Sequence, residues 1–295
     1  MKYVLAISGG IDSMVLLDMV IHKKILPVSS ISDDITVAHF DHGIRIESEY
    51  DAKLVGKIAK NNQLDFVVGR KKLGKDASES TARQARYQFL RAVVQNKTSK
   101  QDKTGDKQKW CLVTAHHQDD LLETIVMNIL RGTNWRGLAP MWAEDIKRPL
   151  LKYSKADLIE YAIKNKLEWA EDETNYSSKY FRNRVRAALY VIESAERKKL
   201  VELYNKQKII RNEIESILES TSCVASLNLK KEQIESLPNE VALEVLRKWT
   251  NEKLTYPQLK RLLQDIINTK NGIDIQPGGK LTVSIKKGNL SLSEL

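Results

Sequence analysis

The chain has 295 residues, with 48 Lys and Arg against 38 Asp and Glu, a formal net charge of +10. Hydrophobic residues make up 42% and charged residues 29%, which fits a globular protein with a core and excludes disorder along the whole chain. No apolar stretch approaches the roughly 20 residues that span a bilayer, and no export signal is visible. We therefore expect a cytoplasmic protein without a membrane partner, and the basic charge suits a polyanion such as nucleic acid.

The first 130 residues alternate between short apolar runs and amphipathic stretches. The apolar runs predict strands, and apolar residues recurring every three or four positions predict helices. The predicted strands are 3–7, 35–40, 66–68 and 111–114, and the predicted helices are 11–21, 47–61, 80–94 and 121–130. Strands that alternate with helices imply parallel β-α-β units, so we expect an α/β fold with an open, mostly parallel sheet and flanking helices.

The middle of the chain is more polar. Residues 97–109 predict an exposed loop, and 154–165 a helix in which Ser154 caps the N-terminus and Asp157 lies three positions on. Residues 187–218 form a long amphipathic stretch that predicts a helix leading to a second domain.

After residue 220 the pattern changes. It predicts helices at 231–237, 240–251 and 257–268, followed by a hairpin of strands 280–285 and 289–292. We divide the chain into a first domain (1–190), a helical linker (191–220) and a small α+β accessory domain (221–295).

A glycine-rich turn joins the first strand to the first helix. Its glycines let backbone N–H groups approach an anion, and the helix N-terminus adds unpaired donors and the dipole. An acidic residue inside a phosphate site makes sense if Mg²⁺ bridges it to the phosphates. The string is neither a Walker A loop, which needs a following Lys, nor a dinucleotide fingerprint, which needs a third Gly. It reads Ser8, Gly9, Gly10, Ile11, Asp12 and Ser13.

This string resembles the PP-loop of the ATP pyrophosphatases, which cleave ATP between the α- and β-phosphates and adenylate a substrate. The resemblance implies that Ser8–Ser13 bind ATP. It also implies the PP-loop, adenine nucleotide α hydrolase-like variant of the α/β fold.

Further strings narrow the resemblance. Two of them end predicted strands, at the sheet edge where an open parallel sheet binds ligands. Together with the first loop they resemble the tRNA(Ile)-lysidine synthetase family, over about Ser8 to Arg186. The strings are His39–Arg45, Glu79–Leu90, Thr114–Asp120, Glu171–Asn175 and Arg182–Arg186.

The resemblance implies a two-step reaction. ATP adenylates the oxygen at carbon 2 of the wobble cytidine in a tRNA(Ile) with a CAU anticodon, and pyrophosphate leaves. The amino group of free L-lysine then displaces AMP, so the codon specificity changes from AUG to AUA. The substrates are ATP, L-lysine and tRNA, with Mg²⁺ as the metal. Whether the chain forms a homodimer stays open.

Within this reaction we assign the acidic residues first. Asp41, Asp119 and Asp120 are the candidate catalytic residues, and Asp41 either binds the amine of lysine or takes its proton. Of the adjacent pair Asp119 and Asp120, one binds Mg²⁺ or the lysine ammonium and the other caps the helix. Asp12 and Asp119 are the candidate Mg²⁺ ligands.

The basic candidates divide by partner. Arg83 is assigned to ATP, and His42, Arg45 and His116, with Asp41, to the lysine or the base. Candidates for tRNA are Arg86, Arg182, Arg184 and Arg186, because Arg binds phosphate bidentately. The alternative for these arginines is exposed ion pairs.

Three rival functions are weighed against this one. A metal-dependent hydrolase would use a cluster drawn from His39, Asp41, His42, His116, His117, Asp119 and Asp120, but it leaves the glycine-rich loop unexplained. A related tRNA thiolase would need catalytic or cluster-binding cysteines. The chain has only Cys111, expected in the core, and Cys223. A non-catalytic RNA-binding protein would have no use for the acidic set.

Overall fold

The computed structural model describes residues 1–43, 48–72, 74, 79–99, 109–143, 145–170, 181–220, 229–269, 272–278 and 280–294. These residues form two compact units, Met1–Tyr204 and Asn205–Leu295.

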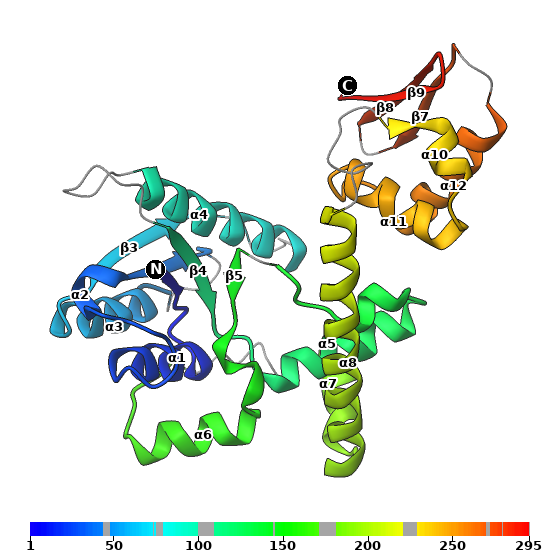
Figure 1. Ribbon diagram of the computed structural model, residues 1–295. Helices are drawn as coiled ribbons and strands as arrows, with labels where there is room; N and C mark the ends of the chain where they lie inside the picture. The colour runs from blue at the N-terminus through cyan, green and yellow to red at the C-terminus, as the bar shows by residue number, and fades with distance from the viewer. Residues whose placement is uncertain are drawn as a thin grey trace. The chain divides into compact units, whose positions relative to one another are not determined.

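The first unit is built on a five-stranded parallel sheet with the strand order β3-β2-β1-β4-β5 (Figure 1). The strands are β1 (Lys2–Ala6), β2 (Ile35–Asp41), β3 (Asp65–Arg70), β4 (Trp110–Thr114) and β5 (Ile146–Lys147). The central strand β1 pairs with both β2 and β4, so that Leu5 lies beside Val37 and Val113. The chain order reverses between β1 and β4, and such a switch point opens a crevice at the carboxyl ends of the two strands.

Helices cover both faces of this sheet (Figure 1). One face packs against α1, α3 and α6 through a core that includes Leu5, Leu16 and Leu158. The other packs against α4 through Val4 and Leu90. Val4 and Leu5 are neighbours on opposite faces, as the two-residue period of a strand requires. The helices are α1 (Ile11–Ile21), α2 (Ile31–Asp34), α3 (Ser48–Asn61), α4 (Glu79–Ser99), α5 (Gln118–Leu130), α6 (Lys155–Lys164), α7 (Phe181–Tyr190) and α8 (Ser194–Ser220), with 3₁₀ turns η1 (Trp135–Leu138) and η2 (Pro149–Lys152).

The predicted α/β fold is confirmed, with three local differences. The strand β5 was not predicted, because two residues are too few to show a period. The helix α4 runs to Ser99, three residues into the predicted loop, where the ammonium of Lys97 pairs with Asp65 and lies 5.3 Å from the ring centre of Trp110. The predicted helix 187–218 is divided between α7 and α8, with a turn at 191–193.

In its described residues, the second unit contains the C-terminal part of α8, three further helices and an antiparallel sheet with the strand order β6-β9-β8-β7. Its core includes Leu246, Leu262, Val283 and Leu290. The elements are α10 (Lys231–Glu235), α11 (Asn239–Trp249), α12 (Tyr256–Asn268), β6 (Leu229–Lys230), β7 (Asp274–Gly278), β8 (Leu281–Lys286) and β9 (Asn289–Glu294). The predicted hairpin is β8 and β9, whereas β6 and β7 were not predicted. The division between the two units falls inside α8, and the boundaries 190 and 220 stay predictions.

Over the ranges described above, the membrane question has a direct answer. No helix among them is both long enough and apolar enough to cross a bilayer.

Candidate functional site

The glycine-rich turn is held in shape by Ser13. Its hydroxyl accepts hydrogen bonds from the backbone N–H of Ser8 (3.2 Å) and of Gly9 (3.1 Å). The same hydroxyl donates to the carbonyl of Gly10 at 2.8 Å. One side chain therefore fixes the loop at the start of α1, where the helix dipole favours an anion.

The two glycines of this loop have different roles. Gly9 has φ +94°, a conformation that favours glycine, and a Cβ at this position would lie 3.3 Å from the Cβ of Asp51 on α3. Gly10 has φ −71° and precedes α1 as its N-cap residue. A Cβ added to Gly10 would have the hydroxyl of Ser8, 3.7 Å away, as its nearest neighbour. The backbone thus requires glycine at position 9 more strictly than at position 10.

A lysine from a distant helix reaches the loop. Lys155, the first residue of α6, places its ammonium 2.5 Å from the carboxylate of Asp12. Its backbone N–H donates to Asp119 at 2.7 Å. Lys155 is not predicted from the sequence, because it lies 143 residues from Asp12 and belongs to none of the motifs.

His117 lies among three carboxylates. Its Nε2 is 3.7 Å from Asp12 and 3.5 Å from Asp120, and its Nδ1 is 3.6 Å from Asp119. Burial alone would lower the pKa of His117, but the contact with Asp119 and the charges of Asp120 and Asp12 raise it above its usual value. The imidazole is therefore biased towards its charged form at this position.

The adjacent acids Asp119 and Asp120 have separate partners. Asp120 accepts the backbone N–H of His117 at 3.2 Å and so caps α5, as predicted for one member of the pair. Asp119 accepts from Arg197 of α8 at 2.6 Å as well as from Lys155. Burial opposes ionisation of both acids, yet the histidine, arginine and backbone donors around them lower both pKa values. Both remain carboxylates over the physiological range.

A second basic group lies at the ends of β4 and β5. His116 is bonded to the hydroxyl of Thr114 at 2.8 Å. Burial, helped by the nearby charges of Arg148, Arg83 and Arg86, lowers the pKa of His116 to about 3, although Asp120 opposes this shift. His116 is therefore neutral at pH 7.

Arg148 follows β5 directly and was not singled out in the sequence. Its Nη1 donates to the carbonyls of Met141 at 2.6 Å and Ile146 at 3.3 Å. On α4, the guanidinium groups of Arg83 and Arg86 lie 4.9 Å and 5.6 Å from the ring centre of Tyr87. The three arginines form a positively charged area around the neutral His116, at the carboxyl end of the sheet.

The predicted site residues Asp41 and His42, at the carboxyl end of β2, lie at the same end of the sheet. Asp41 is buried, accepts the backbone N–H of Gly43 at 2.8 Å and lies 3.6 Å from Arg70. His42 contacts the ring of Phe40 edge-on, with the ring centres 4.8 Å apart. Arg45 lies outside the described residues. Ser8, Asp41, His116 and Arg148 lie at or just after the carboxyl ends of β1, β2, β4 and β5. Because these strands are parallel, the four residues lie at the same end of the sheet.

The predicted tRNA-binding arginines of α7 divide into two kinds. Arg182 and Arg186 donate to the buried carboxylate of Glu123 on α5 at 2.7 Å and 2.6 Å. Arg184 is exposed and lies 5.6 Å from the ring centre of Phe181. Two of the three therefore have a structural partner, and RNA contact by all three stays a prediction.

The side chains of the site differ in how well they could bind a metal ion. Over the described ranges, no group of three or more His, Cys, Asp or Glu side chains is arranged to hold an ion, as the hydrolase would require. His39 is instead buried, with its Nδ1 bonded to the carbonyl of Ile7 at 2.9 Å. Mg²⁺ commonly takes only one or two carboxylates plus substrate phosphates. Asp12, which is partly exposed and has one oxygen towards Lys155, fits that role better than Asp119, whose two oxygens already accept from Arg197 and Lys155.

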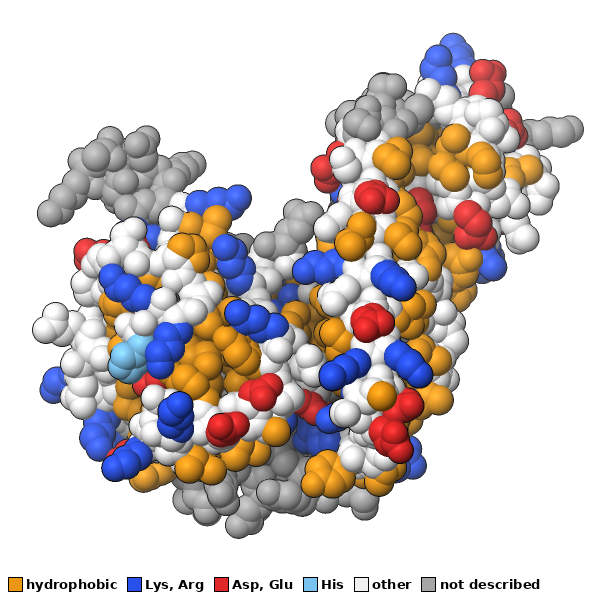
Figure 2. All heavy atoms as spheres, turned by 60° about the horizontal axis from the view of Figure 1, so that its bottom comes forward, with side chains coloured by type: hydrophobic (Ala, Val, Ile, Leu, Met, Phe, Trp, Pro, Cys, Tyr) orange, Lys and Arg blue, Asp and Glu red, His pale blue; other side chains and the backbone are white. Residues whose placement is uncertain are grey.

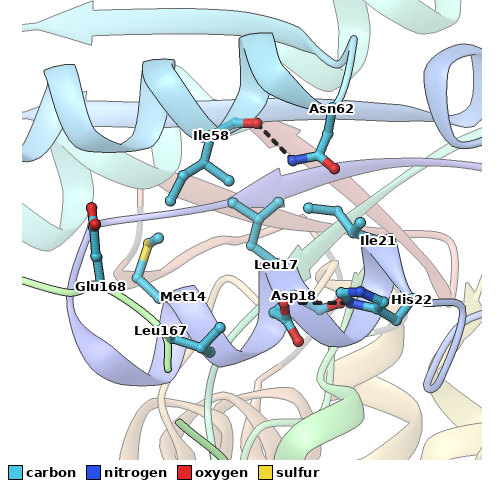
Figure 3. Close-up of a pocket in the computed structure, with 9 residues that line it drawn as sticks. All are labelled: Met14, Leu17, Asp18, Ile21, His22, Ile58, Asn62, Leu167 and Glu168. Carbon is cyan, nitrogen blue, oxygen red and sulfur yellow. Dashed lines mark hydrogen bonds and ion pairs between the residues drawn. The ribbon is translucent and has the colours of Figure 1, made fainter. Parts of the chain in front are cut away.

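A pocket beside α1 and α3 is a different feature (Figure 3). It has a volume of about 140 Å³, and the side chains of Met14, Leu17 and Ile58 point into it. Ligand pockets usually measure about 300–1,000 Å³, and the charged residues here include Asp18 and Glu168, which repel phosphate. This pocket is not the nucleotide site.

The distribution of charge does not locate the predicted RNA contacts. Figure 2 shows basic and acidic side chains interspersed on the face that it presents. The excess of +10 is thus not gathered into one patch on this face.

Two curated proteins illustrate what the chain is similar to in sequence. The chain is 38% identical over 190 residues to the tRNA(Ile)-lysidine synthase of Thermotoga maritima, a match that covers 61% of the chain and 42% of that protein. It is 32% identical over 284 residues to the tRNA(Ile)-lysidine synthase of Streptococcus gordonii, covering 91% of the chain and 60% of that protein. The chain thus spans less than two thirds of the length of these curated relatives.

The fold has a solved counterpart in the U34-tRNA thiolase NcsA from Methanococcus maripaludis. The TM-score is 0.52 at 18% identity, over 71% of this chain and 72% of that one. This likeness shows the α/β fold alone. The family model of the PP-loop domain matches residues 1–192, which include the glycine-rich loop and the ends of all five parallel strands. The chain therefore belongs to the PP-loop domain family.

Proposed function

We propose that the protein is a tRNA(Ile)-lysidine synthase, an ATP-dependent ligase that joins L-lysine to carbon 2 of the wobble cytidine in a tRNA(Ile) with a CAU anticodon. The observation that carries the proposal is the phosphate loop Ser8–Ser13, folded and held open by Ser13, at the same sheet edge as Asp41, His116 and Asp119. The relatives with this name support it.

The loop supplies the adenylation half of the reaction. Backbone N–H groups at the N-terminus of α1 bind the β- and γ-phosphates of ATP, and they stabilise the charge that develops on the departing pyrophosphate. Arg83 binds the nucleotide from α4. Asp12 would hold Mg²⁺, which would supply positive charge next to the triphosphate.

The buried acid at the end of β2 suits the second half. A lysine ammonium must be bound by a carboxylate and must lose a proton before its nitrogen can attack carbon 2 of the cytosine. Asp41 is buried and lies one strand away from the loop, which places it to do either. A neutral His116 can donate a hydrogen bond to the base or accept one from it, without adding positive charge to the site.

The RNA is held by positive charge at the edge of this site. Arg86, which lies beside the Tyr87 ring on α4, and the exposed Arg184 are the first candidates for this contact. Arg182 and Arg186 reinforce α7 against α5 through Glu123, and their remaining N–H groups can reach phosphate. The second unit, 205–295, adds further tRNA contacts. A ligase acting on tRNA would work in the cytoplasm.

A related thiolase is the second candidate, because the solved counterpart of the fold is one. That chemistry needs reactive sulfur or a cluster bound by cysteines. Cys111 is buried in β4, and burial raises the pKa of its thiol, which makes it less reactive. The lysine-transfer reaction is therefore favoured.

The test is incorporation of radiolabelled lysine into tRNA(Ile) with a CAU anticodon, with and without ATP. We expect ATP-dependent labelling by the wild type, none by Asp12→Ala, and normal labelling by Asp33→Ala, which removes an exposed carboxylate on α2. If the folded wild type binds ATP but transfers no lysine, the lysine-transfer function is wrong.

A further inference from the structure

The helices α1 and α6 run side by side in the same direction. Lys155 of α6 contacts Asp12 of α1, and six residues further along both helices Tyr161 donates to Asp18 at 2.7 Å. Both pairs are separated by 143 positions, so the two helices stay in step. Their N-termini therefore meet at the glycine-rich loop, and both dipoles favour an anion there.

Lys155 is fixed at both of its ends. Its backbone N–H is anchored on Asp119 and its ammonium is 2.5 Å from Asp12. The side chain nevertheless keeps 38% of its surface exposed. It is thus a positioned cation that remains accessible at the mouth of the loop.

We propose that Lys155 binds the β- or γ-phosphate of ATP and so supplies the lysine that the loop itself lacks. The inference rests on the proposed nucleotide site. In a Walker A loop the phosphate-binding lysine follows the glycines directly in sequence. Here a lysine instead reaches the loop from the start of another helix, because α1 and α6 pack in parallel.

The contact with Asp12 keeps the ammonium in place before the nucleotide arrives. A triphosphate carries more negative charge than one carboxylate, and the loop N–H groups hold it close to the ammonium. The ammonium therefore changes its main partner from Asp12 to a phosphate oxygen. This leaves an oxygen of Asp12 free.

The test is isothermal titration of ATP and of AMP into the full chain, with neither tRNA nor lysine present. Lys155→Met should weaken ATP binding about 10- to 100-fold, which is typical for loss of one charge-assisted hydrogen bond, and leave AMP binding within about twofold. Lys155→Arg should recover most of the loss. The matched control is Lys164→Met, which removes an exposed lysine from the other end of the same helix.

Two outcomes would overturn the inference. One is a Lys155→Met variant that binds ATP as the wild type does, because Lys155 would then only pair with Asp12. The other is an equal loss of ATP and AMP binding, because the lysine would then only maintain the shape of the site. Thermal unfolding of each variant identifies a general loss of structure. Since no lysine transfer is measured, failure of the ligase reaction leaves this test intact.

Discussion

Glu123 of α5 accepts a hydrogen bond from Arg186 of α7 at 2.6 Å while only 1% of its own side chain is exposed. Arg182 donates to the same carboxylate. This buried acid joins two helices whose sequences are about 60 residues apart. It also orients both arginines at the edge of the candidate site.

Replacing that acid should destabilise the first unit. Glu123→Gln keeps the shape but leaves two guanidinium groups facing a neutral amide, and we expect the free energy of unfolding to fall by about 1–3 kcal/mol. Urea unfolding measures the change. Glu160→Gln, on the exposed side of α6, is the control and should have almost no effect. Equal stability of the Glu123 variant and the wild type would contradict the structural role.

The glycine-rich loop predicts a contrast between neighbouring positions. Gly9→Ala places a side chain on a residue with φ +94° and against Asp51, and we expect a loss of about 1–2 kcal/mol in stability. Gly10→Ala, at φ −71° and with only ordinary van der Waals contacts for the added Cβ, should cost less than about 0.5 kcal/mol. Chemical denaturation of both variants checks the difference. The assignment fails if Gly10→Ala is the more destabilising change.

The low pKa of the buried His116 should make the folded protein less stable in acid. Its pKa is about 3 in the folded protein against the usual 6.5, so only the unfolded chain binds this proton as the pH falls below 6.5. Stability is therefore lost progressively from about pH 6.5 downwards. His39, whose pKa burial also lowers, acts in the same direction.

The contribution of His116 is isolated by comparing the wild type with His116→Gln at several pH values between 4.5 and 7. This window lies above the ordinary range of Asp119 and Asp120. The raised pKa of His117 adds no slope below 6.5, because that histidine is protonated in both states, and its contribution is lost only as the pH rises further. We expect a shallower loss of stability in the variant. Identical slopes in the two proteins would show that His116 is not the group responsible.

The second unit depends on an ion-pair network around Arg247. Its guanidinium is buried and donates to Glu215 at 2.8 Å and to Glu244 at 2.9 Å, and it also pairs with Glu252. Arg247→Met should destabilise this unit by about 3 kcal/mol, because it removes a buried cation that pairs with three carboxylates. Hydrogen exchange should quicken in α11 and not in α1. Faster exchange throughout the chain would argue against a local effect.

Much of the fold follows from local patterns. The first four strands and their helices show clear apolar periods, and Ser154 does cap α6, with Asp157 accepting its backbone N–H at 2.7 Å. β5, β6 and β7 were missed for two reasons. Two residues carry no period, and β7 contains a Pro and a Gly that weaken a strand pattern.

The candidate site was less accessible to sequence reasoning. The glycine loop, Asp41 and Asp120 belong to compact strings at strand ends, which a pattern can reveal. Lys155, Arg197 and Arg148 lie outside those strings, and their roles come from helices that pack together only in the folded chain. Long-range contacts of single polar side chains have no sequence period.

The position of β1 in the middle of the sheet has a consequence for synthesis. Both neighbours of this strand are required to cover its backbone, yet β4 begins at Trp110, some 100 residues after β1 ends at Ala6. A growing chain therefore carries the buried residues of β1 with one unpaired edge until most of the first unit has been made. Unpaired edges of apolar strands associate with one another. Release of a chain that stops before Thr114 should yield an aggregating product, even though it already contains every residue of the phosphate loop.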